Sequence, residues 1–267
     1  MFILRQIKIT LVLIILCHSS CKKDEVLPQN EVQVLSNPGI GLATFHKLNN
    51  DLPLDQHPES SVAYYRFYWR DYEPTDDNFQ DAELFKLLAS AAEKNQTVGI
   101  RLMGFGDNER IPDWLKGKVQ EFTFSKSNVA SNYYPDQNDV DYILEINEAV
   151  AHFASIADGD LRLNHVEIGS AGFYGEWHMS EAEDEGAKMP TIENQNLLID
   201  QYFNSFKKTP IIALIGEPND GALPLKYAAN LGAGWRADCL GDGHWNGKSW
   251  NHMDHFYPQH IAKSNIQ

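Results

Sequence analysis

The alternation of strand-like and helix-like segments constrains this chain more than any other feature of its sequence. Segments rich in β-forming residues lie at 61–69, 97–104, 163–169, 210–216 and 232–240, after a short apolar run at 39–45. Apolar residues at three- and four-residue steps lie between them, clearly at 82–92 and 140–157 and more weakly at 197–206 and 225–230. The first pattern is typical of strands and the second of amphipathic helices. Strands separated by helices predict an α/β fold with a parallel sheet covered by helices.

Two arrangements satisfy this pattern, an open doubly wound sheet and a (β/α)8 barrel. No Gly-x-Gly-x-x-Gly motif or P-loop follows the first predicted strand, so the usual signature of a nucleotide-binding sheet is absent. Polar and aromatic residues gather instead at the carboxyl ends of several strands, where barrel enzymes place their active sites. We therefore predict a (β/α)8 TIM barrel.

The predicted barrel is incomplete. The chain contains about six strand–helix units, and a barrel that lacks two units leaves two sheet edges unpaired. One explanation is that two strands are hidden in segments that read as loops. Residues 105–134 have room for a hairpin, however, and hardly for a parallel strand with its crossover. We expect instead that the chain is a fragment, truncated at its C-terminus.

The first residues predict export. Two basic residues precede a short apolar run, and two serines stand directly before Cys21, as in a secretory signal. This arrangement resembles a bacterial lipoprotein signal, in which that cysteine carries the lipid, and the Cys-Lys-Lys-Asp-Glu start is similar to surface-export signals of the Bacteroidota. It implies a signal peptide at 1–20, a tether at 21–36 and a barrel domain at 37–267 of an outer-membrane lipoprotein in the cell envelope. An ordinary secretory peptide and an uncleaved anchor are the alternatives.

Charge and cysteine content narrow the range of partners. The formal net charge is −15, and removal of the predicted signal would make it more negative. This charge argues against nucleic acid and anionic membrane surfaces as partners. Of the three cysteines, only Cys239 would remain free in the mature chain, so no disulfide framework is expected. Stability must therefore come from a hydrophobic core.

The stretch G-S-A-G-F-Y-G-E-W-H at 169–178 follows a predicted buried strand. Its glycines allow the backbone to turn sharply or to approach a ligand closely. A packed core has little use for glutamate, histidine and aromatic side chains mixed with glycines. We therefore predict a catalytic or binding site here, at the mouth of the barrel.

Further stretches carry a family resemblance. W-R-D-Y-E-P at 69–74, followed by a helix and V-G-I-R-L at 98–102, resembles the second and third units of clan A glycoside hydrolases, among which family-42 β-galactosidase-like barrels have this W-x-x-x-E-P layout. I-P-D-W-L at 111–115 and the run G-x-x-G-E-W-H resemble more closely a group of exported bacterial barrel proteins, many without an established substrate. The similarity covers roughly residues 36–260.

This resemblance implies retaining hydrolysis of glycosidic bonds. In clan A the proton donor is a glutamate after strand four, which corresponds to Glu176, and the nucleophile after strand seven would lie beyond residue 267. Gly175 stands where the family has an asparagine, so that asparagine's contact is not expected. The two carboxyl groups must lie about 5–5.5 Å apart, and we expect burial against Trp177 to raise the pKa of Glu176. The alternative is an exposed loop glutamate.

Candidate binding residues stand near the predicted strand ends. Aromatic rings stack on the apolar faces of sugars, and neighbouring polar groups bind the hydroxyl groups. The predicted substrate-binding residues are Trp69, Arg101, Tyr174, Trp177, His178, Glu217, Trp235, Asp242 and His244. Some of these tryptophans must be core residues, and Glu217 could equally begin a loop. Glu167 lies inside a strand, where we predict an ion pair with Arg101 or Arg66.

No metal or other cofactor is predicted. His244, His252, Asp254 and His255 are close in sequence, but their spacing matches no zinc signature. The leading hypothesis is an exported glycoside hydrolase-like protein that acts on oligosaccharides or polysaccharides and is held at the membrane by its lipid. A non-catalytic carbohydrate-binding barrel and a structural lipoprotein are the alternatives.

Overall fold

The computed structural model describes residues 43–51, 53, 59–106, 111–123, 133–179, 188–215, 222–237, 254 and 257–259. The chain divides into two units, 1–36 and 37–267. The first unit, with the predicted signal peptide, Cys21 and the tether, lies outside the described residues. All structural statements below concern the second unit.

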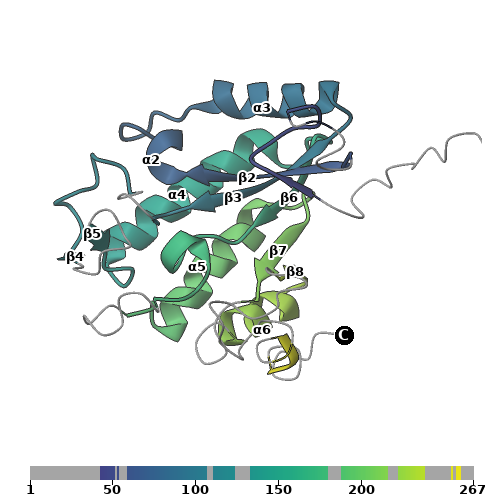
Figure 1. The fold of residues 1–267 in the computed structure, drawn as a ribbon. Coiled ribbons are helices and arrows are strands. Elements are labelled where there is room, and N and C mark those ends of the chain that lie inside the picture. The colour runs from purple at the N-terminus through teal and green to yellow at the C-terminus, as the bar shows by residue number, and fades with distance from the viewer. Residues whose placement is uncertain are drawn as a thin grey trace, which may run out of the picture. The chain divides into compact units, whose positions relative to one another are not determined.

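Six parallel strands form one curved sheet (Figure 1). The strands are β1 (Ala43–Phe45), β2 (Val62–Tyr68), β3 (Thr97–Met103), β6 (Leu163–Glu167), β7 (Ile211–Leu214) and β8 (Gly234–Arg236). Their order in the sheet is the same as their order along the chain, and each pairs in parallel with the next. A doubly wound sheet reverses its strand order at a switch point, whereas a (β/α)8 barrel does not. The described strands therefore form part of a TIM barrel, as predicted.

Helices follow most of these strands. The helical elements are α2 (Trp69–Tyr72), α3 (Asp81–Glu93), α4 (Val140–Ala157), the 3-10 turn η1 (Phe173–Gly175), α5 (Ile192–Ser205) and α6 (Ala222–Asn230). An antiparallel pair, β4 (Glu121–Thr123) with β5 (Tyr133–Pro135), lies between β3 and α4. This is the hairpin for which the sequence had room in that segment. None of the described helices is long and apolar enough to cross a membrane.

The core lies between the sheet and its helices. Every second residue of β3 points outward, and Val98, Ile100 and Leu102 are buried there because side chains alternate between the two faces of a strand. The buried residues of α3 are Leu84, Leu88 and Ala91. Their three- and four-residue spacing places them on one helical face. The same spacing in α4 and α5 explains why these helices pack against each other as well as on the core.

The inner face of the sheet is polar. The inward positions of β3 are Gly99 and Arg101, and their partners on β6 are His165 and Glu167. A side chain at position 99 would collide with the His165 ring, because an added Cβ would lie 2.3 Å from its Cε1 atom. Glycine is therefore required for this packing, and the charged residues above it form the interior layer described next.

Candidate functional site

A cluster of charged residues occupies the inner face near the carboxyl ends of the strands. We name it the arginine–glutamate cluster, and its members are Arg66 of β2, Arg101 of β3, Glu167 of β6, Glu176 after β6 and Arg236 of β8. Four strands or strand ends far apart in sequence thus contribute to one network, because the carboxyl ends of parallel strands meet at one edge.

Glu167 is the buried centre of the cluster. Its side chain is fully inaccessible and lies 2.6 Å from Arg101 Nη2 and 3.0 Å from Arg236 Nη2, and the Tyr64 hydroxyl donates to it at 2.6 Å. Burial alone would raise the pKa of Glu167, but the charges of Arg101 and Arg236 outweigh burial and lower the pKa to about 2. The predicted ion pair between Glu167 and Arg101 is confirmed.

Glu176 forms the accessible end of the cluster. Its Oε1 atom lies 2.7 Å from Arg66 Nη2 and 2.9 Å from Arg101 Nη1, and its side chain is 18% exposed. His178 Nε2 lies 3.7 Å from the other oxygen. Burial raises the pKa of Glu176, but His178 and the two arginines together lower it to about 2. This direction is opposite to the raised pKa that we expected from burial against Trp177, because the hydrogen bond with His178 and the charges of Arg101 and Arg66 together outweigh burial.

The loop that carries Glu176 has an unusual backbone. Gly172, Tyr174, Gly175 and Trp177 all have positive φ angles, of 79°, 57°, 69° and 59°. Such angles are strained for the two aromatic residues. A side chain at 175 is excluded because an added Cβ would lie 2.4 Å from the carbonyl oxygen of Gly169. The glycines of the G-x-x-G-E-W-H run therefore serve to fold the chain back on itself.

Hydrogen bonds hold this loop in place. Phe173 N donates to His178 O at 2.8 Å, and Trp177 N donates to Ala171 O at 3.1 Å. From outside the loop, Arg101 Nη1 donates to Tyr174 O at 2.8 Å, and the buried Gln137 accepts from Gly172 N at 2.7 Å. Several independent contacts thus fix the strained backbone and with it the position of Glu176.

Two of the predicted binding tryptophans are core residues. Trp69 and Trp177 are 0% and 2% exposed, and their indole N–H groups donate to Glu73 and to Ile168 O. Neither ring has an exposed face on which a sugar could stack. The prediction that these two tryptophans line the binding cleft is therefore wrong. The third predicted tryptophan, Trp235 of β8, is 45% exposed, so its ring is accessible.

The remaining predicted residues divide into two groups. Arg101 is fully buried inside the arginine–glutamate cluster, whereas Tyr174 and His178 are partly exposed beside it. Glu217, Asp242 and His244 lie outside the described residues. The sequence analysis missed Arg236. This residue stands in the strand Gly234–Arg236, and side chains two positions apart in a strand lie on the same face, so its position in the strand could have indicated it.

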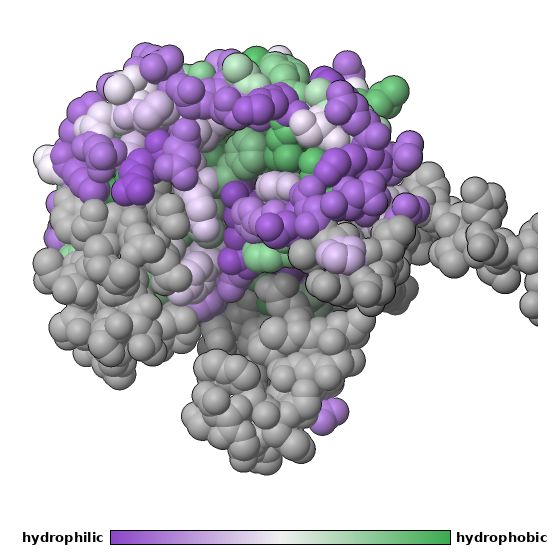
Figure 2. All heavy atoms as spheres, turned by 45° about the horizontal axis from the view of Figure 1, so that its top comes forward, coloured by the Kyte–Doolittle hydropathy of each residue, from purple (hydrophilic) through white to green (hydrophobic). Residues whose placement is uncertain are grey.

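A cavity of about 230 Å³ adjoins the cluster at the carboxyl half of β2. Arg66 lines it together with Phe67, Tyr72, Asp71 and Gln80. A second recess of about 630 Å³ shares Asp71 and Gln80 with it. In Figure 2, hydrophobic side chains lie in a hollow that hydrophilic side chains surround. An apolar floor with convergent polar groups is the usual character of a small-molecule site.

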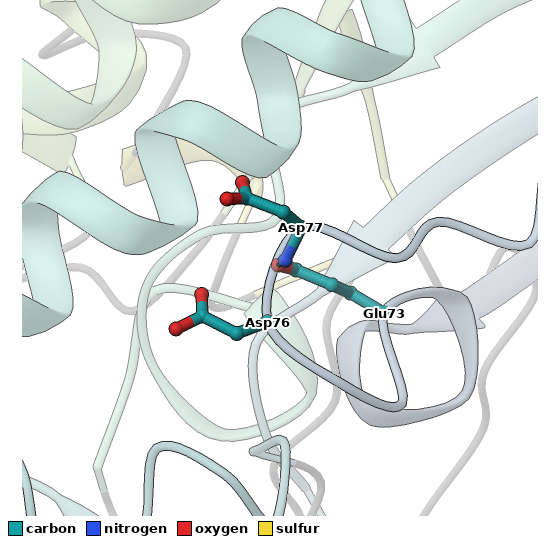
Figure 3. Close-up of side chains that lie close together, drawn as sticks. All are labelled: Glu73, Asp76 and Asp77. Carbon is teal, nitrogen blue, oxygen red and sulfur yellow. Dashed lines mark hydrogen bonds between the residues drawn. The ribbon is translucent and has the colours of Figure 1, made fainter.

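The W-x-x-x-E-P motif forms a structural turn. Glu73 accepts a hydrogen bond from Trp69 Nε1 at 2.7 Å. It also accepts one from the backbone nitrogen of Asp77 at 3.0 Å, and these two residues lie beside Asp76 (Figure 3). Glu73, Asp76 and Asp77 are the one group of potential metal-ligating side chains found within the described part of the chain. Both Glu73 oxygens already have N–H donors and Asp76 pairs with Lys118, so these contacts account for the group without an ion.

Comparisons with known proteins bear on the fold. No protein-family model matches the chain, and no curated protein is similar to it. Among solved structures, the catalytic domain of β-amylase from Paenibacillus polymyxa is 10% identical with a TM-score of 0.56, and the match covers 77% of this chain and 76% of that one.

Two further structures are more distant. Endo-glycoceramidase II from Rhodococcus sp. is 11% identical with a TM-score of 0.41, covering 59% of this chain, and this chain spans 42% of its length. A β-galactosidase from the psychrophilic Marinomonas ef1 is 12% identical with a TM-score of 0.42, covering 67% of this chain and 37% of that one. At these identities the β-amylase likeness shows the fold alone. The chain therefore has a partial (β/α)8 barrel that is similar in fold to the β-amylase catalytic domain.

Proposed function

We propose that this protein binds carbohydrate at the carboxyl edge of its barrel, with Glu176 as a fixed acceptor for sugar hydroxyl groups. The observation that carries this proposal is the pair of arginine contacts that hold Glu176 ionised and partly exposed. The β-amylase scaffold, a carbohydrate-acting one, favours the same class of ligand.

The ionised state of Glu176 favours binding over the predicted role as resting proton donor. A general acid works best when its pKa lies near the working pH, and the pKa of Glu176 is lowered to about 2. An ionised carboxylate is instead a strong acceptor for hydroxyl donors. Glu167, which shares Arg101 with Glu176, is also ionised, so these two residues do not form an acid–base pair.

Retaining hydrolysis is the second candidate. An ionised glutamate held beside a sugar is the state that a nucleophile requires, since it attacks the anomeric carbon or stabilises the oxocarbenium-like transition state. In this mechanism Glu176 acts as the nucleophile or the stabilising carboxylate, and another group donates the proton to the leaving group. The same oligosaccharides should therefore be tested for cleavage as well as for binding.

Isothermal titration with a panel of oligosaccharides tests the proposal. We expect the Glu176→Gln variant to bind at least about tenfold more weakly, because it loses the charged acceptor and its ion pairs with the arginines. Glu148→Gln is the matched control, because Glu148 is exposed on α4. Affinity unchanged in Glu176→Gln, or no saccharide bound by the wild-type protein, would refute the proposal.

We also propose that the protein is anchored by lipid at Cys21, as its lipoprotein-like signal predicts. Mass spectrometry of membrane-extracted protein should find an acylated N-terminal Cys21. Cys21→Ser should abolish the acyl mass, while Cys239→Ser should retain it. A protein that begins at another residue without lipid would contradict the anchor.

A further inference from the structure

Phe45, the last residue of β1, and the following His46 lie beside Arg66 of the arginine–glutamate cluster. The guanidinium of Arg66 lies 5.3 Å from the centroid of the Phe45 ring. The backbone nitrogen of Arg66 donates to His46 Nε2 at 3.3 Å, and its Nη2 atom lies 2.7 Å from Glu176 Oε1. One arginine therefore connects the end of β1 with the carboxylate that we propose as the acceptor for sugar hydroxyl groups.

Phe45 presents an exposed aromatic ring on the inner face of the sheet. Its register partner on β2 is Tyr64, and paired residues of neighbouring strands point to the same face. Tyr64 points inward, because its hydroxyl donates to the buried Glu167, and the two rings stack with their centroids 5.9 Å apart. Phe45 is nevertheless 56% exposed. Such a ring offers a flat apolar surface to the apolar face of a sugar.

His46 adds a hydrogen-bond donor next to this ring. Its Nε2 atom accepts from a backbone N–H group, so the proton of the neutral imidazole is on Nδ1. Burial and the charge of Arg66 lower the pKa of His46, which keeps the ring neutral near neutral pH. Nδ1 has no hydrogen-bond partner within the described part of the chain, and it is not among the buried atoms that lack one there. A ligand can therefore reach it.

The surroundings fix the orientation of the His46 ring. The ring packs edge-to-face against Phe45 at 4.5 Å and against Tyr65 at 5.2 Å between centroids. The backbone of His46 has a φ angle of 51°, which is uncommon for a residue other than glycine. Strained angles of this kind persist where the structure enforces them, and they cluster at ligand sites. The donor is thus held in place before a ligand binds.

We propose that Phe45 and His46 form part of the carbohydrate site, with the Phe45 ring stacked on a neutral sugar ring and His46 Nδ1 donating to one of its oxygen atoms. This inference rests on the proposed carbohydrate-binding function. Glu176 only accepts hydrogen bonds, whereas His46 donates one, so a sugar meets a donor and an acceptor beside an aromatic face. The donor is uncharged, and it therefore favours a neutral hydroxyl-bearing ring over an acidic one.

Isothermal titration with maltotriose, cellotriose and β-1,4-galactotriose tests the role of the ring. Phe45→Leu keeps an apolar side chain but loses the flat face, so we expect the trisaccharide that the wild-type protein binds to bind about fivefold more weakly. Phe45→Trp should retain the affinity. Phe85→Leu is the matched control, because Phe85 of α3 also lies beside a guanidinium, that of Arg162 at 6.0 Å.

Two substitutions of His46 separate sugar binding from a structural role. His46→Asn supplies an N–H donor near the position of Nδ1 and tolerates a positive φ angle, so it should retain most of the affinity. His46→Gln supplies an acceptor for Arg66 N but no donor at Nδ1, and we expect about fivefold weaker binding. A residue that only caps the edge of β2 would give the opposite order. His152→Gln is the control, because His152 of α4 pairs with Asp81.

The outcomes distinguish this inference from the proposed function. Weaker binding by Glu176→Gln, together with unchanged binding by Phe45→Leu and His46→Gln, would refute the inference and leave carbohydrate binding in place. No trisaccharide bound by the wild-type protein would refute both. If a variant does not fold, as judged by circular dichroism, nuclear Overhauser contacts between the sugar and the Phe45 ring in the wild-type protein decide the question, and their absence would refute the stacking.

Discussion

At the scale of single residues, the ionisation of Glu176 determines what this site can do. Arg101 contacts both Glu176 and Glu167, so one guanidinium holds two carboxylates in their charged form. Arg66 adds a second contact to Glu176. A carboxylate held in this way accepts hydrogen bonds or attacks an electrophile, but it retains no proton to donate near neutral pH.

The stability of the protein should decrease in acid because of these two residues. The pKa values of Glu167 and Glu176 are lowered in the folded state from 4.5 to about 2. Lowered folded-state values stabilise the fold above the unfolded pKa, and this stabilisation is lost as pH falls from about 5 to about 2. We expect the free energy of unfolding, measured by urea denaturation, to fall across this range by on the order of 2–3 kcal/mol for each of the two residues.

Substitution of Glu176 should flatten this pH profile. Glu176→Gln has no charge to lose, so its free energy of unfolding should change less between pH 5 and pH 2 than that of the wild-type protein. Glu148→Gln should retain the full wild-type dependence. Parallel profiles for Glu176→Gln and the wild-type protein would show that the arginine contacts do not stabilise the folded state.

The sequence could locate Glu176 but not its ionisation. The glycine-rich stretch after a strand correctly predicted an unusual backbone at the carboxyl edge. His178, which lowers the pKa, is a neighbour in sequence, but the two arginines that lower it further are 110 and 75 residues away, and no local pattern reports such a contact. Burial of Trp69 and Trp177 was equally hidden, because an aromatic residue at a strand end fits a core as well as a cleft.

At the scale of elements, the loop around η1 combines strain with dense hydrogen bonding. Substitution of its glycines should therefore be costly. Gly175 has a φ angle of 69°, and an added Cβ would lie 2.4 Å from Gly169 O, which is backbone and cannot easily move. We expect Gly175→Ala to lower the free energy of unfolding by more than about 2 kcal/mol and to weaken saccharide binding by displacing Glu176.

Gly117 is the matched control for this substitution. Its φ angle is 78°, but an added Cβ would meet no atom within 4 Å. Gly117→Ala should therefore lose only the backbone preference of glycine, about 1 kcal/mol. Equal losses in the two variants, measured by urea denaturation, would mean that the contact with Gly169 O does not constrain the loop.

Gln137 should position the same loop from the segment before α4. Its side chain accepts from Gly172 N at 2.7 Å and donates to Met179 Sδ at 3.3 Å, so it joins both ends of the loop. Gln137→Leu leaves a buried N–H without an acceptor, which costs about 1–3 kcal/mol. We expect this loss of stability together with weaker saccharide binding, whereas Leu in place of the exposed Gln120 should change neither. Undiminished binding by Gln137→Leu would exclude the positioning role.

Hydrophobic periodicity predicted most elements, and it placed the ends of some helices but not of others. The helix predicted at 82–92 is observed as Asp81–Glu93, and the one at 140–157 as Val140–Ala157. The next helix begins at Ile192, five residues before the prediction, because the Thr191 side chain caps it by accepting from Asn194 N. A cap depends on one hydrogen bond and not on the apolar period, so the period alone could not place it.

At the scale of the whole molecule, one polar network joins strands that are distant in sequence. Tyr64 of β2, Arg101 of β3 and Arg236 of β8 all bind Glu167 of β6. The chain's alternating pattern predicted the parallel sheet and its barrel topology. The sequence predicted one contact of this network, Glu167 with Arg101, but not the contacts of Tyr64 and Arg236. Register decides which interior residues meet, and register depends on all the strands together.

Because of this network, the contributions of Arg101 and Glu167 to the free energy of unfolding should not be additive. Arg101→Met and Glu167→Gln each leave a buried charge with fewer partners, so each should lower the free energy of unfolding by about 3–5 kcal/mol. The double variant removes both charges, and its loss should be smaller than the two single losses combined by at least about 1 kcal/mol. Urea denaturation of the four proteins measures this coupling.

The exposed pair Lys86–Glu83, with side chains 73% and 67% accessible, provides the comparison. The losses of free energy from its two single substitutions should be additive within about 0.5 kcal/mol. Additive losses at Arg101 and Glu167 as well would mean that the interior charges stabilise the barrel separately and not as one network.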